Sequence, residues 1–115
     1  MKARVGMVWA GVVLYYLLIL CLSSVPGEAL ASLPQFAYMD KLVHISLYAI
    51  FGFLLGGTRT RAVVLLLLGA ALSGFDEFYQ HWIPGRFPDV YDWMMDVAGV
   101  SLGLWLARRF FCCEK

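Results

Sequence analysis

The stretch AVVLLLLGAALSGF, residues 62–75, decides the fold class of this chain. It contains no charged residue, follows Arg61 directly and ends at the acidic pair Asp76-Glu77. A transmembrane helix needs about 20 mostly apolar residues. The next strong helix breaker is Pro84-Gly85. The sequence therefore predicts a membrane-spanning helix over residues 61–82, with two carboxylates toward one end.

Three further apolar stretches resemble this one and are separated from it by turn-forming residues. The four predicted spans cover residues 5–23, 41–57, 61–82 and 91–109. The breaks between them contain Pro26-Gly27, Gly56-Gly57 and Pro84-Gly85. We therefore expect an all-α integral membrane bundle of four antiparallel transmembrane helices, which forms a single domain over residues 1–115.

The composition supports a membrane protein and excludes other classes. Hydrophobic residues make up 62% of the 115 residues, and charged residues only 15%, against roughly 25% in a typical soluble domain. A small soluble protein needs more polar residues than this to cover its large surface. The net charge of +1 gives no basic field for nucleic acid, so we expect no nucleic-acid partner.

The distribution of charge along the chain predicts the orientation in the membrane. Seven of the nine basic residues lie at the side that holds both termini: Lys2, Arg4, Arg59, Arg61, Arg108, Arg109 and Lys115. Cytoplasmic loops of membrane proteins carry an excess of Lys and Arg. We therefore expect both the N-terminus and the C-terminus in the cytoplasm.

Polar residues from three spans are expected to meet at one depth. With a rise of about 1.5 Å per residue, Asp76 lies about 22 Å above Arg61, and Asp96 about 18 Å above Arg108. By the same measure His44 lies about 22 Å above the cytoplasmic boundary of its own span. The hydrocarbon core is about 30 Å thick, so these residues predict a polar layer in its outer half. Ionisable residues at membrane depth indicate function by default.

Spacing within each span places the polar layer on helix faces that can meet. Lys41, His44 and Tyr48 are three and four residues apart and share a face. Asp76 and Gln80 are four apart with Glu77 beside them, and Asp92 and Asp96 are also four apart. The expected ligand-binding residues are Lys41, His44, Tyr48, Asp76, Glu77, Gln80, Arg86, Asp92 and Asp96. Small residues continue the same faces toward the cytoplasm and predict close helix packing. They are Gly52, Gly56, Gly99 and Gly103.

The polar layer and its rim contain more acids than bases. Six acids, namely Asp40, Asp76, Glu77, Asp89, Asp92 and Asp96, stand against the two bases Lys41 and Arg86. So many carboxylates at reduced dielectric cannot all stay ionised without compensation. Either some are protonated, or a cation joins them. Carboxylates suit Mg²⁺, Ca²⁺ or Mn²⁺, and the candidate ligands for such a divalent cation are Asp76, Glu77, Asp92 and Asp96.

The ordered motifs resemble those of the VanZ-like family of small bacterial membrane proteins, named after the teicoplanin-resistance protein VanZ. The motifs are Asp40-Lys41-x-x-His44-x-x-x-Tyr48, then Asp76-Glu77-x-x-Gln80 with Pro84-Gly85-Arg86, then Asp92-x-x-x-Asp96-x-x-Gly99. The resemblance covers residues 9–107. It implies a multi-pass protein of the bacterial cytoplasmic membrane, in the cell envelope, with a link to glycopeptide resistance. The family usually has Asn at the position of Asp96, so this chain adds a charge there.

Several functions fit an outward-opening polar pocket. One is binding of a phospholipid headgroup or a lipid-linked cell-wall precursor, with Lys41 and Arg86 at the phosphate. Another is an enzyme acting on a lipid phosphate, with His44 as general base and Glu77 as acid. The third is a structural subunit that contacts a membrane-protein partner, and the fourth is proton or cation transport. The apolar inner half, which contains no polar path, disfavours transport.

Overall fold

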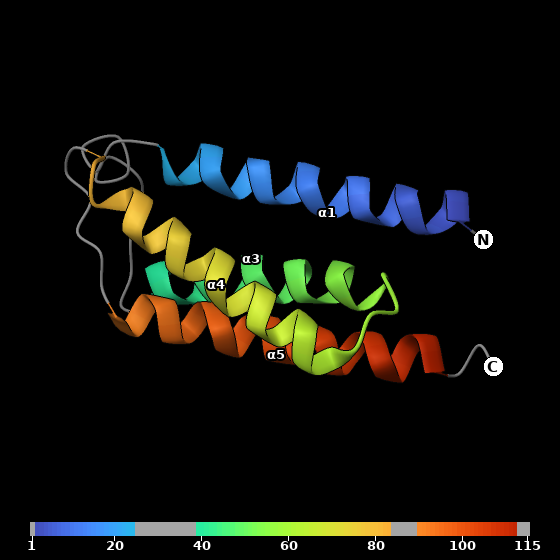
Figure 1. Cartoon of the computed structure of the whole chain (residues 1–115). Coiled ribbons are helices and arrows are strands. Elements are labelled where there is room, and N and C mark those ends of the chain that lie inside the picture. Colours follow the sequence, from blue (N-terminus) through green and yellow to red (C-terminus); the bar gives the residue numbers. More distant parts are fainter. Residues whose placement is uncertain (1, 25–38, 84–89, 113–115) are drawn as a thin grey trace.

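The computed structural model describes residues 2–24, 39–83 and 90–112, with side chains for residues 4–24, 42–83 and 90–110. These residues form four helices, and no strand occurs among them. The helices are α1 (Lys2–Ser23), α3 (Met39–Gly56), α4 (Ala62–Gln80) and α5 (Val90–Cys112). They lie side by side and alternate in direction, so that α1 begins and α5 ends at the same end of the bundle (Figure 1). The expected all-α class with four helices is confirmed.

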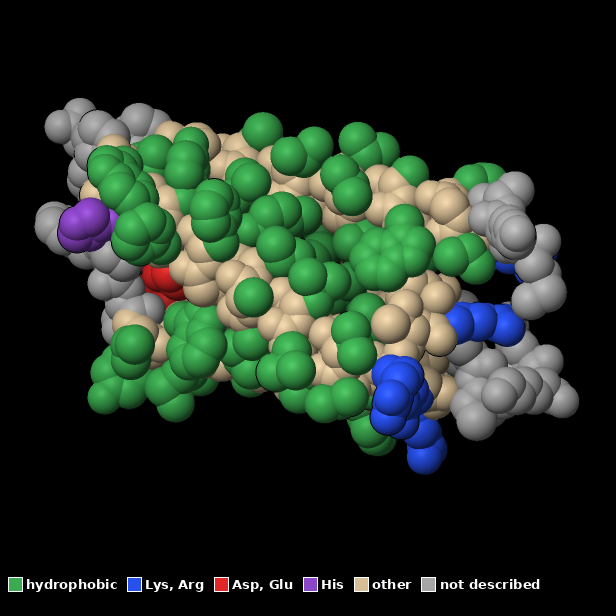
Figure 2. Space-filling model, viewed as in Figure 1, with side chains coloured by type: hydrophobic (Ala, Val, Ile, Leu, Met, Phe, Trp, Pro, Cys, Tyr) green, Lys and Arg blue, Asp and Glu red, His purple; other side chains and the backbone are tan. Residues whose placement is uncertain are grey.

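Two of the helices are long and apolar enough to cross a membrane. They comprise Arg4–Ser23 of α1 and Ala62–Gln80 of α4, and α3 contains the shorter apolar stretch Leu42–Gly56. Large apolar side chains also cover much of the surface, as Figure 2 shows. Met7, for example, is 74% exposed and Leu14 is 68% exposed. An outer surface of this kind is costly in water and favourable against lipid, which agrees with a membrane protein.

Helices α3 and α5 pack with their backbones in close contact. A Cβ atom on Gly99 of α5 would lie 2.6 Å from the carbonyl oxygen of Ile45 in α3. A Cβ on Gly103 would overlap the carbonyl oxygen of Ala49, and one on Gly52 would overlap that of Val100. The predicted close packing of small residues is thereby confirmed. It fixes the spacing of the two helices that carry most of the polar layer.

Two tyrosines of α1 attach this helix to α3 and α4. The Tyr15 hydroxyl donates to the carbonyl oxygen of Leu47 at 2.8 Å, and the Tyr16 hydroxyl donates to that of Leu72 at 2.6 Å. Both rings contact the fully buried Phe51, with centroids 6.1 and 5.6 Å from it. A hydroxyl in an apolar environment needs such a partner. The attachment therefore combines aromatic packing with two satisfied donors.

The short turn between α3 and α4 brings basic residues to the end where α1 begins. The Thr58 hydroxyl donates to the Leu55 carbonyl oxygen at 2.7 Å, and Arg59 adopts a left-handed conformation with φ 62°. Arg61 then precedes the first residue of α4. In Figure 2 basic side chains lie at one end of the molecule and an acidic patch lies near the other. We call these the basic end and the acidic end.

Candidate functional site

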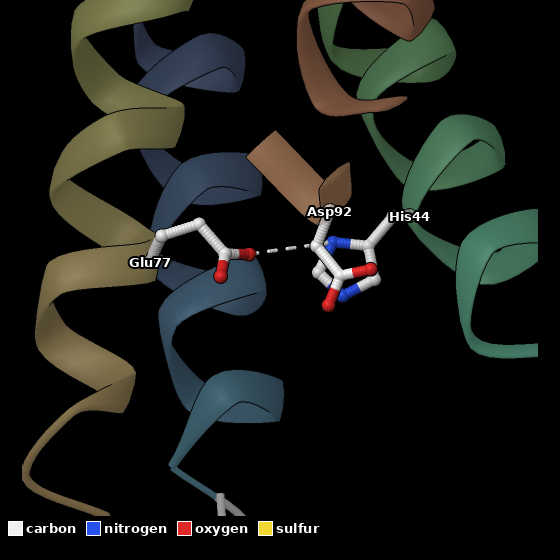
Figure 3. A group of neighbouring side chains, drawn as sticks. All are labelled: His44, Glu77 and Asp92. Atoms are coloured by element: carbon white, nitrogen blue, oxygen red, sulfur yellow. Dashed lines mark ion pairs between the residues drawn. The ribbon is translucent and has the colours of Figure 1, made fainter. Parts of the chain in front are cut away.

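Three helices bring His44, Glu77 and Asp92 together near the acidic end. Figure 3 shows the three side chains converging from α3, α4 and α5. One ligand atom from each lies within 4.8 Å of those of the other two. The His44 Nδ1 and Glu77 Oε1 atoms are 3.8 Å apart. We refer to these three residues as the His–carboxylate triad.

A fourth residue, Asp96, orients the histidine by a contact with its Nδ1 atom. Its Oδ1 lies 2.7 Å from His44 Nδ1, and the Asp96 side chain has no exposed surface. When Asp96 is ionised it accepts a proton from Nδ1, and in a neutral imidazole Nε2 is then the acceptor. Asp96 thus sets both the orientation of the ring and the tautomer that it offers.

A second polar contact lies on the neighbouring turns of α3 and α4. The Tyr48 hydroxyl donates to Asp76 Oδ2 at 2.8 Å, and each of these two residues is only 1% exposed. The adjacent residues Asp76 and Glu77 therefore have different neighbours. Asp76 faces Tyr48, whereas Glu77 belongs to the triad. The predicted layer is thus divided into two contacts at one end of the bundle.

Gln80 contacts α1, a helix from which no residue was predicted to belong to the layer. Its Nε2 donates to Ser23 Oγ at 3.3 Å, and both side chains are buried. In addition, the Ser24 hydroxyl lies 2.8 Å from the Tyr79 hydroxyl. Two serines directly after an apolar span look like a helix end in the sequence. Their depth, level with the end of α4, is a signal from which a contact could have been considered, but it does not say which face of α1 meets α4.

Two predicted rim residues fall outside what the structure describes. Arg86 lies in the segment 84–89, and the side chain of Lys41 is outside the described residues although its backbone belongs to α3. Their expected place at the rim, and with it the opening of the pocket toward the outer face, stays a prediction.

The described part of the site is rich in buried carboxylates. Exposure is 1% for Asp76, 7% for Glu77, 8% for Asp92 and 0% for Asp96. Asp76 Oδ1 and Asp96 Oδ2 accept no hydrogen bond from any residue that the structure describes. Removing a carboxylate oxygen from water without a partner costs several kcal/mol. Chemically, the arrangement suits binding of a cation or an amine, or general base catalysis by His44.

One comparison with known proteins gave a match. A family model described as VanZ/LLP1 matches residues 7–111 of the chain, a range that includes every described residue of the site. No curated protein and no solved structure is significantly similar to the chain. The match confirms the family resemblance drawn from the three motifs.

Proposed function

Since the chain belongs to the VanZ/LLP1 family, we propose that it binds the polar headgroup of an envelope lipid in the bacterial cytoplasmic membrane. The observation that supports this most is the buried polar site of His44, Tyr48, Asp76, Glu77, Asp92 and Asp96, set in a bundle with an apolar exterior. In a bilayer, the polar ligands most available to such a site are lipid headgroups. Residues of this kind at membrane depth are functional by default.

The chemistry of the site indicates what part of a headgroup each side would bind. The four buried carboxylates with His44 favour a positively charged group, either an amine or a bound cation. Lys41 and Arg86, if they lie at the rim as their positions predict, would bind phosphate. A phospholipid and a lipid-linked cell-wall precursor share this chemistry. Binding the precursor would also link the protein to teicoplanin resistance, because a held headgroup is shielded from an antibiotic outside the cell.

In the proposed topology all four helices cross the membrane, with both termini in the cytoplasm. Arg59 and Arg61 lie between α3 and α4, and Arg108 and Arg109 lie near the end of α5, so all four are at the end where α1 begins. The positive-inside rule predicts that such a basic end faces the cytoplasm. We expect a green fluorescent protein fused after residue 115 to fluoresce and an alkaline phosphatase fused there to be inactive. The same two reporters within residues 84–89 should give the opposite pattern. Active phosphatase at the C-terminus would reverse the proposed orientation.

Native mass spectrometry of protein extracted gently from bacterial membranes tests lipid binding. We expect the wild type to retain a phosphorylated lipid. Arg86→Ala and Asp92→Asn should each weaken its binding about tenfold, the effect of losing roughly 1.4 kcal/mol of binding free energy, and so lower the fraction of protein that retains it. Ser101→Ala is the control, because this serine of α5 is exposed and its hydroxyl donates to the Val97 carbonyl oxygen of its own helix. Equal retention in all four proteins, or none in any, would contradict the proposal and favour a structural subunit.

The contact between His44 and Asp96 also favours a second candidate, an enzyme acting on a lipid phosphate. A histidine held at 2.7 Å by a buried carboxylate has the orientation required of a general base. Glu77, 3.8 Å from the same ring, would be the acid. In the mass spectra, an enzyme would show a chemically altered lipid in the wild type. Glu77→Gln would then retain the unaltered lipid, whereas a pure binding protein shows the same lipid in both.

A further inference from the structure

We propose that the His–carboxylate triad holds a divalent transition-metal ion, Zn²⁺ or Mn²⁺. Metal–ligand distances of about 2.0–2.2 Å place any two ligands of one ion within about 4.4 Å of each other. One ligand atom each from His44, Glu77 and Asp92 lies within 4.8 Å of those of the other two. Small rotations of these side chains would therefore bring all three to one ion.

Two buried carboxylate oxygens that have no hydrogen-bond partner among the described residues are an independent indication of a positive charge. Asp96 is fully buried, and its carboxylate points to His44 through Oδ1 while its Oδ2 accepts no hydrogen bond from the described residues. Asp76 Oδ1, also buried, is in the same situation. Buried carboxylate oxygens of this kind are stabilised when a cation lies nearby.

The position of Asp96 is also the one that a metal-binding histidine requires. Such histidines donate their second ring proton to a carboxylate or a carbonyl oxygen, which fixes the ring and strengthens the ligand. With Nδ1 directed to Asp96, the His44 Nε2 lone pair is the one offered to the ion. Asp96 therefore acts as a positioning residue and not as a ligand.

The ligand set selects the kind of metal. An imidazole nitrogen suits Zn²⁺ and its neighbours in the first transition row, whereas Mg²⁺ and Ca²⁺ prefer oxygen ligands alone. The four carboxylates expected from the sequence would have formed an all-oxygen site. In the structure Asp76 contacts Tyr48 and Asp96 contacts His44. The ligand atoms that lie close together come instead from one histidine and two carboxylates, so the set mixes nitrogen and oxygen. Three protein ligands leave coordination positions open, where, on the proposed function, a headgroup phosphate oxygen would bind.

Metal titration of the full chain in detergent tests this proposal, with the chain's two histidines as a matched pair. After removal of metal by a chelator, Zn²⁺, Mn²⁺ and Mg²⁺ are added separately, and bound metal is measured by elemental mass spectrometry and calorimetry. We expect about one Zn²⁺ or Mn²⁺ per chain and no retained Mg²⁺. His44→Gln should weaken binding at least tenfold, while the same change at the exposed His81 should leave it unaltered.

Several results would overturn the metal site. They are no binding of Zn²⁺ or Mn²⁺ by folded wild type, equal loss in His44→Gln and His81→Gln, or retention of Mg²⁺ in place of the transition metals. If His44→Gln does not fold, the His81→Gln protein decides alone, because His44 is then its one histidine. The nuclear magnetic resonance signals of that ring should shift on addition of Zn²⁺. Unchanged signals would contradict the proposal.

Lipid retention measured on the same samples separates this inference from the proposed function. Lipid retained by chelator-treated wild type that binds no metal would overturn the metal site and leave the headgroup proposal intact. Metal bound by wild type that retains no lipid, with or without the ion, would support the metal site and overturn headgroup binding. Loss of lipid on chelation, with recovery on addition of Zn²⁺ or Mn²⁺, would support both.

Discussion

Gly103→Ala is expected to destabilise the protein by about 3 kcal/mol or more, at the upper end of what overpacking costs in a well-packed core. The reason is the close contact of α5 with α3. A Cβ atom at this position would overlap the carbonyl oxygen of Ala49 and lie 2.5 Å from the backbone nitrogen of Phe53. Backbone atoms cannot turn aside as a side chain does, so the helices must separate. Thermal unfolding in detergent, followed by circular dichroism, measures the loss.

Gly11→Ala is the matched control for this prediction. It makes the same chemical change in the middle of α1, where the added Cβ has no contact within 4 Å beyond its chain neighbours and the backbone of its own helix. Because alanine favours a helix over glycine by roughly 1 kcal/mol, this variant should be neutral or slightly more stable. If Gly103→Ala and Gly11→Ala unfolded at the same temperature, α3 and α5 would not be in the backbone contact described here.

The fold followed from the sequence because each helix carries its own evidence. Long apolar stretches and turn residues predicted four helices, and glycines four residues apart predicted which faces of α3 and α5 meet. The structure gives helix ends and not membrane boundaries: α5 covers Val90–Cys112 and so contains the predicted span 91–109. Charge marks the membrane surface and does not end a helix, which is why α5 continues past Arg108 and Arg109.

For the described polar residues, the sequence predicted that they lie at similar depths but not which of them contact one another. Counting the rise along each helix placed Asp76 and Glu77 at nearly one depth, and both lie in the buried layer. Depth does not give rotation, however. Successive residues of a helix point about 100° apart, so Asp76 reaches Tyr48 while Glu77 reaches His44. The contact of Ser23 with Gln80 was missed for a similar reason, since the facing side of α1 depends on packing that one helix does not encode.

The Tyr48–Asp76 contact leads to the second large effect. Tyr48→Phe is expected to lower the free energy of unfolding by about 1.5–3 kcal/mol, the range for a hydrogen bond to a charged group. Only the hydroxyl is removed, yet Asp76 is buried, and its other oxygen already accepts no hydrogen bond from the described residues. The change therefore leaves the Asp76 carboxylate with no hydrogen-bond donor among the described residues. Unfolding in denaturant, monitored by tryptophan fluorescence, gives the value.

Tyr15→Phe is the comparison that makes this prediction specific. The Tyr15 hydroxyl also crosses between helices, but it donates to a neutral carbonyl oxygen, so its loss should cost only about 0.5–1.5 kcal/mol. Replacing both partners, as Tyr48→Phe with Asp76→Leu, should recover much of the loss because no buried carboxylate then remains. If Tyr48→Phe costs no more than Tyr15→Phe, Asp76 is effectively neutral in the folded protein. The buried layer would then need less positive charge than the proposed metal ion brings.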